Sequence, residues 1–302
     1  MLEKRRNENF IGDGLGVEGR FCGLPDSYSS LEESSIVVLP APFEYSVSYQ
    51  KGTEKGPRAI IEASRNMELY DIETDSEVYK LGIHTAPPIC KGEREEVFKE
   101  IEHKASGYIR KGKFLASLGG EHSISFPLIK AHGELFPGMT VLHIDAHSDL
   151  RDSYEGNPYS HACVMARVQD LESVGGIVSV GVRSMCVEEK ARLSRTRAFF
   201  SHDLTPDLLW VEKVLGALTE NVYVSFDIDA FDSGVMPSTG TPEPGGLDWR
   251  SVSYLLKMTA RKKNIIGCDI VELLPLEGFK SPDFLAAKLL YTLLSYKFAS
   301  KL

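Results

Sequence analysis

The sequence has few cysteines and no apolar run long enough to span a membrane. Five cysteines stand among 302 residues, an odd number with no C-x-x-C pair. This spacing excludes a regular disulfide framework and a cysteine-ligated zinc site, and it favours a reducing compartment such as the cytoplasm. The longest apolar stretch, 284–294, is about one third too short for a membrane helix and contains Lys288. We therefore predict a cytoplasmic protein that does not contact membranes.

The chain also lacks a long basic run, a low-complexity segment and a Pro/Gly linker. It carries 34 Lys and Arg against 43 Asp and Glu, a formal charge of −9. An acidic balance argues against a nucleic-acid partner and mildly favours small cationic ligands. No apolar segment of the secretory type follows the basic N-terminus. Residues 1–34 are polar and predict an N-terminal arm, and residues 35–302 predict one domain.

Short apolar runs alternate with longer helical patterns along the rest of the chain. The expected strands are 36–39, 114–118, 140–144, 177–182, 222–226 and 265–270. The expected helices include 93–110, 125–135, 187–195, 208–218, 249–262 and 281–296. Near-continuously apolar strands that alternate with helices predict an α/β fold whose parallel sheet is covered on both faces. Ligands of such sheets bind beyond the carboxyl ends of the strands.

Three of these strand ends are followed by aspartate and histidine. G-G-E-H-S follows 114–118, D-A-H-S-D follows 140–144, and D-I-D follows 222–226. Alternate residues of an extended segment point to the same side. The candidate ligands are His122, Asp145, His147, Asp149, Asp227 and Asp229. An isolated Asp-x-Asp is usually a solvated turn, but three such ends of one sheet predict a metal centre. His143 lies deeper in its strand and predicts a buried, hydrogen-bonded histidine.

Four clustered carboxylates need compensating positive charge. Six ligands are too many for one tetrahedral ion, and they suit two ions if Asp145 and Asp227 bridge. One ion would then take His122, Asp145, Asp149 and Asp227, and the other would take Asp145, His147, Asp227 and Asp229. A carboxylate-rich set without cysteine favours Mn²⁺ before Zn²⁺.

The motifs resemble those of the ureohydrolase family, the arginases and agmatinases, and look closest to the agmatinase branch. The matching strings are GGEHS (119–123), HIDAHSDLRD (143–152), YSHACV (159–164), VSFDIDAFD (224–232), TGTPEPGGL (239–247) and DIVELLP (269–275), with KGTEKGPRAI (51–60) and ELYD (68–71) upstream. Two departures are Glu121, where the family usually has Asp, and Asp232-Ser233, where it usually has Asp-Pro. We expect Glu121 to orient His122.

The resemblance implies a three-layer α/β/α fold with a mostly parallel eight-stranded sheet, two Mn²⁺ per chain, and a homo-oligomer, trimeric or hexameric. It implies that His161 carries protons near the leaving amine and that Glu272 binds the guanidinium of a small cationic substrate. Without the resemblance, they would be a loop histidine and a strand-end carboxylate. Asp149 is placed to accept a proton from the attacking water.

The resemblance predicts hydrolysis of agmatine to urea and putrescine. Arginases carry an amide two places after the last ligand of D-x-H-x-D, and this chain has Arg151 there. Asp152, Glu155 or Glu44 would bind the terminal ammonium of agmatine. If Asp152 or Glu155 does not neutralise Arg151, a carboxylate tail is favoured.

The alternative substrates are aminopropylagmatine, guanidinobutyrate and arginine. A single-zinc hydrolase and a non-catalytic metal-binding protein are the alternatives outside the family activity.

Overall fold

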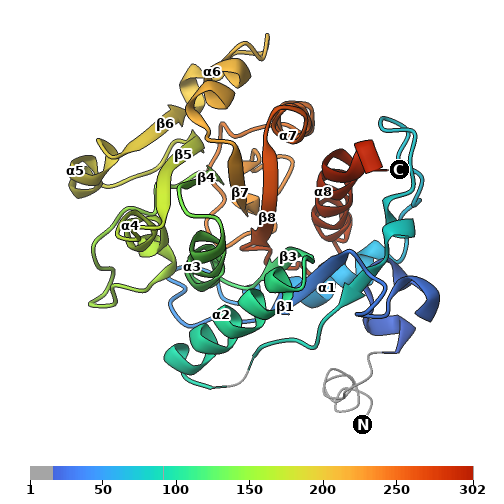
Figure 1. Cartoon of the computed structure of the whole chain (residues 1–302). Coiled ribbons are helices and arrows are strands. Elements are labelled where there is room, and N and C mark those ends of the chain that lie inside the picture. The colour runs from blue at the N-terminus through green and yellow to red at the C-terminus, as the bar shows by residue number, and fades with distance from the viewer. Residues whose placement is uncertain (1–15, 91, 302) are drawn as a thin grey trace.

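The computed structural model describes residues 16–90 and 92–301, and these residues are built around one sheet of eight strands. Figure 1 shows the sheet with helices on both sides. The strands are β1 (Ile36–Ala41), β2 (Ile83–Thr85), β3 (Phe114–Gly119), β4 (Met139–Ile144), β5 (Val174–Val182), β6 (Thr196–Phe200), β7 (Asn221–Asp227) and β8 (Asn264–Val271). Their order is β2-β1-β3-β8-β7-β4-β5-β6, and every neighbouring pair is parallel. The prediction of a mostly parallel eight-stranded sheet is confirmed.

Helices cover both faces of the sheet, as the apolar strands require. One layer contains α1 (Gly56–Ser64), α6 (Trp210–Ala217), α7 (Trp249–Lys262) and α8 (Ser281–Phe298). The other contains α2 (Arg94–Arg110), α3 (Ser125–Leu135) and α4 (Val164–Gln169). Along β1, Ile36 and Val38 pack into the first layer while Val37 and Leu39 pack into the second. This alternation of a two-sided strand produces the three-layer α/β/α architecture.

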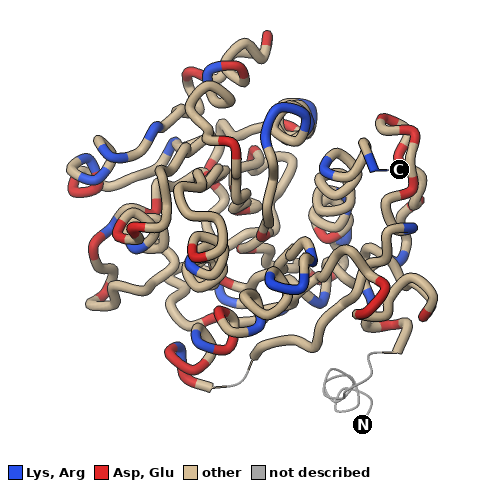
Figure 2. The backbone as a smooth tube through the Cα atoms, viewed as in Figure 1, with Lys and Arg blue, Asp and Glu red and all other residues tan. Residues whose placement is uncertain are grey.

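The outer surfaces of the helices carry charges of both signs. Figure 2 shows acidic and basic residues interspersed along α2, while the strands are mostly uncharged. Helix α2 begins with a capping box in which Glu93 and Glu96 bond each other's backbone N–H groups. Such a cap satisfies amides at the start of the helix that have no partner within it.

Helix α8 contains the longest apolar stretch of the sequence. It packs against α1 and α7, and most of its side chains are buried. Among the described residues, no helix has the length and apolar character needed to cross a bilayer.

Two edge strands and one helix differ from the sequence prediction. Strand β2 has three residues, and in β6 only Phe199 is buried while Arg197 is exposed, so neither forms a continuous apolar run. The expected helix 187–195 is instead a short 3-10 turn followed by α5 (Lys190–Leu193). Edge strands are covered less completely than central ones, and their apolar signal is correspondingly weaker.

The predicted N-terminal arm lies partly outside the described residues, which begin at residue 16. Within the described part, Phe21 is fully buried and Leu24 is 2% exposed in the main core. The backbone N–H of Phe21 donates to Oγ1 of Thr85 (2.9 Å). The expectation that this segment stays outside the core was therefore wrong here, because two apolar side chains attach it to the sheet edge. The domain boundary at residue 34 stays a prediction.

Candidate active site

The first candidate ligand, His122, follows β3 through a close approach of two backbones. A Cβ atom on Gly120 would lie 2.1 Å from the carbonyl oxygen of Phe43, so only glycine fits there. The backbone N–H of His122 donates to Oε1 of Glu272 (2.6 Å), which follows β8. The central strands β3, β8, β7 and β4 are neighbours, and their carboxyl ends meet at this position.

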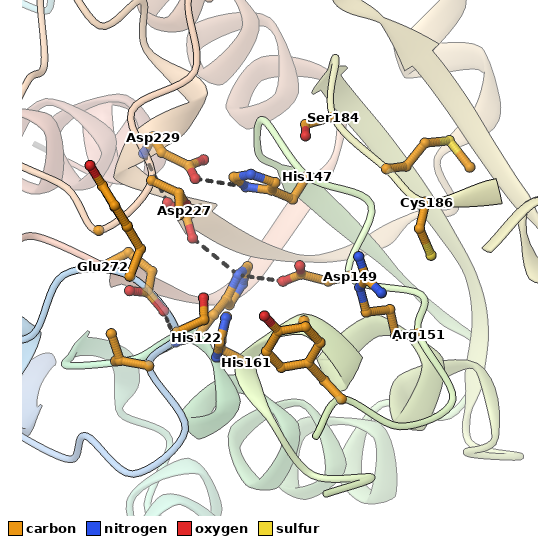
Figure 3. Close-up of a pocket in the computed structure, with 18 of the residues that line it drawn as sticks. His122, His147, Asp149, Arg151, His161, Ser184, Cys186, Asp227, Asp229 and Glu272 are labelled. Atoms are coloured by element: carbon orange, nitrogen blue, oxygen red, sulfur yellow. Dashed lines mark hydrogen bonds and ion pairs between the residues drawn. The ribbon is translucent and has the colours of Figure 1, made fainter. Parts of the chain in front are cut away.

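Three carboxylates surround one ring nitrogen of His122, and Figure 3 shows two of them, Asp149 and Asp227. Its Nδ1 lies 3.1 Å from Oδ2 of Asp145, 3.1 Å from Oδ2 of Asp149 and 3.3 Å from Oδ2 of Asp227. These aspartates come from the ends of β4 and β7. The structure thus brings together the four residues predicted for the first ion.

The remaining two candidate ligands lie beside the same aspartates. Nδ1 of His147 is 2.8 Å from Oδ2 of Asp229 and 3.6 Å from Oδ1 of Asp145. The backbone N–H of Asp229 donates to Oδ1 of Asp227 (2.8 Å). Asp145 therefore lies between His122 and His147, and Asp227 contacts both His122 and Asp229. This is the placement expected of bridging ligands, and the six predicted residues form one cluster.

The hydrogen bonds of His122 leave one nitrogen for a cation. Its Nε2 lies 3.0 Å from Oγ of Ser225, whose hydroxyl donates to Oδ1 of Asp269 (2.9 Å). Because the serine proton goes to Asp269, Nε2 of His122 is the donor, and in the neutral ring Nδ1 carries the lone pair. Within the described chain, the buried Nδ1 atom has no hydrogen-bond partner. A lone pair facing three carboxylates fits a divalent metal ion.

The electrostatics of the cluster indicate the same need for positive charge. Burial raises the pKa of Asp227 well above its usual range, and the charges of Asp229 and Asp145 raise it further. Burial and the Asp145 charge also raise the pKa of Asp149. Burial lowers the pKa of His147, but Asp229 and Asp145 outweigh it and raise the pKa to about 12. Divalent cations would compensate this concentration of negative charge.

His143 is buried and hydrogen-bonded, as predicted. Its Nε2 lies 2.8 Å from Oδ2 of Asp145, and its Nδ1 lies 3.0 Å from Oγ of Ser179. One of its ring nitrogens lies within 4.8 Å of ligand atoms of His122, Asp145 and Asp149, which is close enough for His143 to share a metal ion with them. Since both nitrogens already have partners, we assign His143 to orienting Asp145.

Two residues of the site have backbone conformations that non-glycine residues rarely adopt. Asp149 has φ 52° and Glu272 has φ 64°. The carbonyl of Asp149 accepts from the backbone N–H groups of Met165 (3.0 Å) and Ala166 (3.1 Å), which hold the turn. Left-handed non-glycine residues cost about 1–3 kcal/mol and are found mainly at functional sites. Both carboxylates are thus aimed at the cavity by strained turns.

The cluster forms the floor of a cavity of about 280 Å³. His161 lines this cavity and packs edge-on against Tyr154, with ring centroids 5.8 Å apart. Glu272 also lines it, and burial raises the pKa of its carboxyl well above the usual range. Figure 3 shows both residues beside the cluster. The structure thus places the three predicted catalytic side chains, Asp149, His161 and Glu272, around one space.

Two of the acids expected to bind the substrate tail are engaged elsewhere. Oε2 of Glu44 accepts from the backbone N–H groups of Gly52 (2.6 Å) and Thr53 (2.7 Å). Asp152 is exposed and pairs with Arg192 (2.5 Å) and with Arg167. Neither lines the cavity. Their assignment to the tail was wrong, because a sequence does not show which loop amides and arginines a carboxylate will meet.

Arg151 lines the cavity, as its position predicts, but neither expected acid neutralises it. Its guanidinium lies over the ring of Tyr154, 5.2 Å from the centroid. Glu155 lines an adjacent pocket. The pKa of Glu188 is lowered, first by a backbone hydrogen bond and partly by the charge of Arg151. Among the described residues, Arg151 has no ion pair within 4.0 Å. Only longer-range electrostatic attraction, such as that of Glu188, acts on its charge.

Known proteins share this arrangement of strands and motifs. A model of the arginase family matches residues 34–295. The chain belongs to the arginase family. It is 40% identical over 271 residues to an N(1)-aminopropylagmatine ureohydrolase of Thermus thermophilus, covering 88% of this chain and 91% of that one. It is 35% identical to an agmatinase of Bacillus anthracis, covering 82% and 87%.

The structural comparison agrees with the sequence comparison. The crystal structure of agmatine ureohydrolase of Thermoplasma volcanium superposes with a TM-score of 0.83 at 32% identity, covering 91% of this chain and 94% of that one. The predicted resemblance to ureohydrolases is confirmed, and the chain is an enzyme of this family that acts on guanidino compounds.

Sequence reasoning missed several residues that support the ligands. Ser225 and Asp269 hold His122 from β7 and β8, inside the sheet. Their signal was a polar side chain within an otherwise apolar strand. Ser46 contacts both His161 and Glu121 from the loop after β1. Glu44 of the same loop was expected to bind the substrate tail, but no local pattern distinguished Ser46 from its neighbours.

Proposed function

We propose that this enzyme hydrolyses the guanidinium group of a linear polyamine-type cation to urea and the corresponding amine, using two Mn²⁺ ions. N(1)-Aminopropylagmatine is the first candidate substrate, and agmatine, predicted from the sequence, is the second. The observation that supports the metal chemistry best is the unpartnered Nδ1 of His122 facing three carboxylates. Trimeric or hexameric assembly and a cytoplasmic location stay predictions.

Each side chain around the cavity has a defined task in this proposal. The two ions would be held by the six clustered residues and would supply Lewis acidity and lower the pKa of a water molecule. Asp149 accepts a proton from the attacking water. Glu272 pairs with the planar guanidinium, a favoured carboxylate geometry. His161 delivers a proton to the leaving nitrogen, because an amide anion is a poor leaving group.

The tail preference rests on the relatives and on the cavity wall. The relative at 40% identity carries the aminopropylagmatine name, whereas the agmatinase of Bacillus anthracis is 35% identical. By itself, an Arg151 without an ion pair favours a carboxylate tail and disfavours the ammonium of a short tail, so the polyamine assignment gives more weight to the relatives. Aminopropylagmatine keeps an ammonium at the agmatine position and adds a second one further along the chain, which can reach Tyr49, a residue of the cavity wall that is 74% exposed. Cations are attracted to such aromatic faces.

A substrate panel tests this proposal directly. On one Mn²⁺-loaded preparation, we expect kcat/KM for urea release to rank aminopropylagmatine first, agmatine second, and guanidinobutyrate and arginine well below. A clear preference for either carboxylate-bearing compound would contradict the polyamine assignment and leave the metal chemistry intact. Absence of urea from all four compounds would contradict the proposed reaction.

Arg151→Ala should change the ranking without reducing the chemistry. Removal of one positive charge from a partly buried wall changes the binding of a tail charge by about 1 kcal/mol, or about fivefold. We expect kcat/KM for agmatine to rise and that for guanidinobutyrate to fall by this factor. The matched control is Arg250→Ala, an exposed arginine on α7 outside the cavity. An equal change for both substrates would show that Arg151 does not sense the charge of the tail.

A further inference from the structure

Glu121, which stands before His122 where the family usually has Asp, accepts four hydrogen bonds, three of them from the loop after β1. Its Oε2 accepts from the backbone N–H groups of Tyr45 (2.6 Å) and Ser46 (2.6 Å). Its Oε1 accepts from the hydroxyl of Ser46 (3.0 Å) and from that of Ser123. Four donors converge on a side chain that is 1% exposed, so both oxygens of Glu121 act as acceptors. Glu121 therefore holds the loop after β1 and does not orient the His122 ring, contrary to the sequence expectation.

The hydroxyl of Ser46 joins Glu121 to His161. Its oxygen accepts from the backbone N–H of His161 (3.0 Å) and lies 3.1 Å from Nδ1 of the same residue. A serine hydroxyl has one proton and two lone pairs. The proton goes to Oε1 of Glu121, which accepts the hydrogen bond. Both lone pairs then remain for His161, one for the backbone N–H and one for the ring.

This count determines the tautomer of His161. Because the Ser46 oxygen can only accept from the ring, Nδ1 of His161 must carry a proton. In the neutral ring the lone pair is then on Nε2, which makes no hydrogen bond to any described residue and belongs to a ring that lines the cavity. Edge-on packing against Tyr154 restrains the same ring from its other side.

We propose that Ser46, anchored by Glu121, is the positioning residue that fixes His161 in its Nδ1–H tautomer with Nε2 available to exchange a proton in the cavity. This inference deepens the proposed function, since it rests on His161 as the proton carrier. It assigns a role to a loop 75 residues from Glu121 and 115 from His161 in the sequence.

The Ser46 hydroxyl can be removed without removing the backbone hydrogen bonds that anchor its loop. In Ser46→Ala the backbone N–H groups of residues 45 and 46 still donate to Glu121, so the loop keeps its anchor. Ser123→Ala is the matched control, because the Ser123 hydroxyl also donates to Glu121 but makes no hydrogen bond to His161 among the described residues. Ser46→Thr keeps the hydroxyl and serves as the conservative variant.

We expect Ser46→Ala to lower kcat roughly 10–100-fold, the effect of removing a partner that orients an active-site histidine. KM should change less than threefold, Ser46→Thr should restore most of the rate, and Ser123→Ala should stay within about threefold of the parent. If Ser46→Ala and Ser123→Ala lowered kcat by the same factor and changed KM by the same factor, the loop would be disturbed in general and the proposal would be overturned.

A spectroscopic measurement tests the tautomer without requiring turnover. In ¹⁵N-histidine-labelled protein loaded with diamagnetic Mg²⁺, two-bond proton–nitrogen correlations distinguish the two tautomers, and the His161→Asn variant assigns the signal. We expect the Nδ1–H pattern in the parent and its loss in Ser46→Ala. An Nε2–H pattern in the parent overturns the inference even if urea is released. An inactive parent with the Nδ1–H pattern would instead contradict the proposed function alone.

Discussion

Asp227→Asn should abolish urea release and weaken the binding of both metal ions. Asp227 lies 3.3 Å from Nδ1 of His122 and accepts from the backbone N–H of Asp229, so it contacts both parts of the cluster. An amide is nearly isosteric with the carboxylate but supplies no negative charge. We expect kcat to fall at least about 10³-fold, since the activating charge and the geometry of the ions are both lost. Metal analysis after equilibrium dialysis should give well below two equivalents per chain.

Two comparison variants make this result specific. Asp232→Asn changes an aspartate five residues later whose carboxylate accepts from the amides of Gly234 and Gly245, away from the cluster. It should keep the metal content of the parent. Asp149→Asn removes a ligand predicted for one ion only, so it should lower metal content by about one equivalent. Retention of two tightly bound ions by Asp227→Asn would disprove its bridging role.

The ligand cluster could be predicted because the chemistry and the fold use the same sequence signal. Buried parallel strands are continuous apolar runs, and the polar residues that end them must lie at one edge of the sheet. The alternation after β4 predicts that Asp145, His147 and Asp149 share one side, although the structure brings Asp149 there through a left-handed turn. The edge strands β2 and β6 lack such a run, and from the residues alone they were missed; only the resemblance implied eight strands.

The remaining features depend on contacts between loops that are far apart in the sequence. Glu44 and Asp152 have the charge expected of ammonium ligands, but backbone amides and arginines occupy them. Glu121 was expected to support its neighbour His122 and instead binds a loop 75 residues earlier. A carboxylate pairs with whichever donors the folded loops bring to it, and no local pattern encodes that choice.

His161→Asn should reduce kcat by roughly 10²–10⁴-fold, the usual contribution of a positioned general acid, while KM changes little. His161 lines the cavity but is not in the ligand cluster, so the variant should keep the metal content of the parent. The matched control is His103→Asn, an exposed histidine on α2, which should behave as the parent does. A KM effect as large as the kcat effect would indicate that His161 binds substrate and does not transfer a proton.

The leaving group provides a second test of the same role. If His161 protonates the departing nitrogen, the rate lost in His161→Asn should depend on how basic that nitrogen is. For a guanidino compound that releases a weakly basic amine, expulsion needs less help from an acid, so the parent and the variant should differ much less than they do with agmatine. An equal rate loss for both leaving groups would contradict proton delivery by His161, because a ring that only shapes the cavity cannot distinguish them.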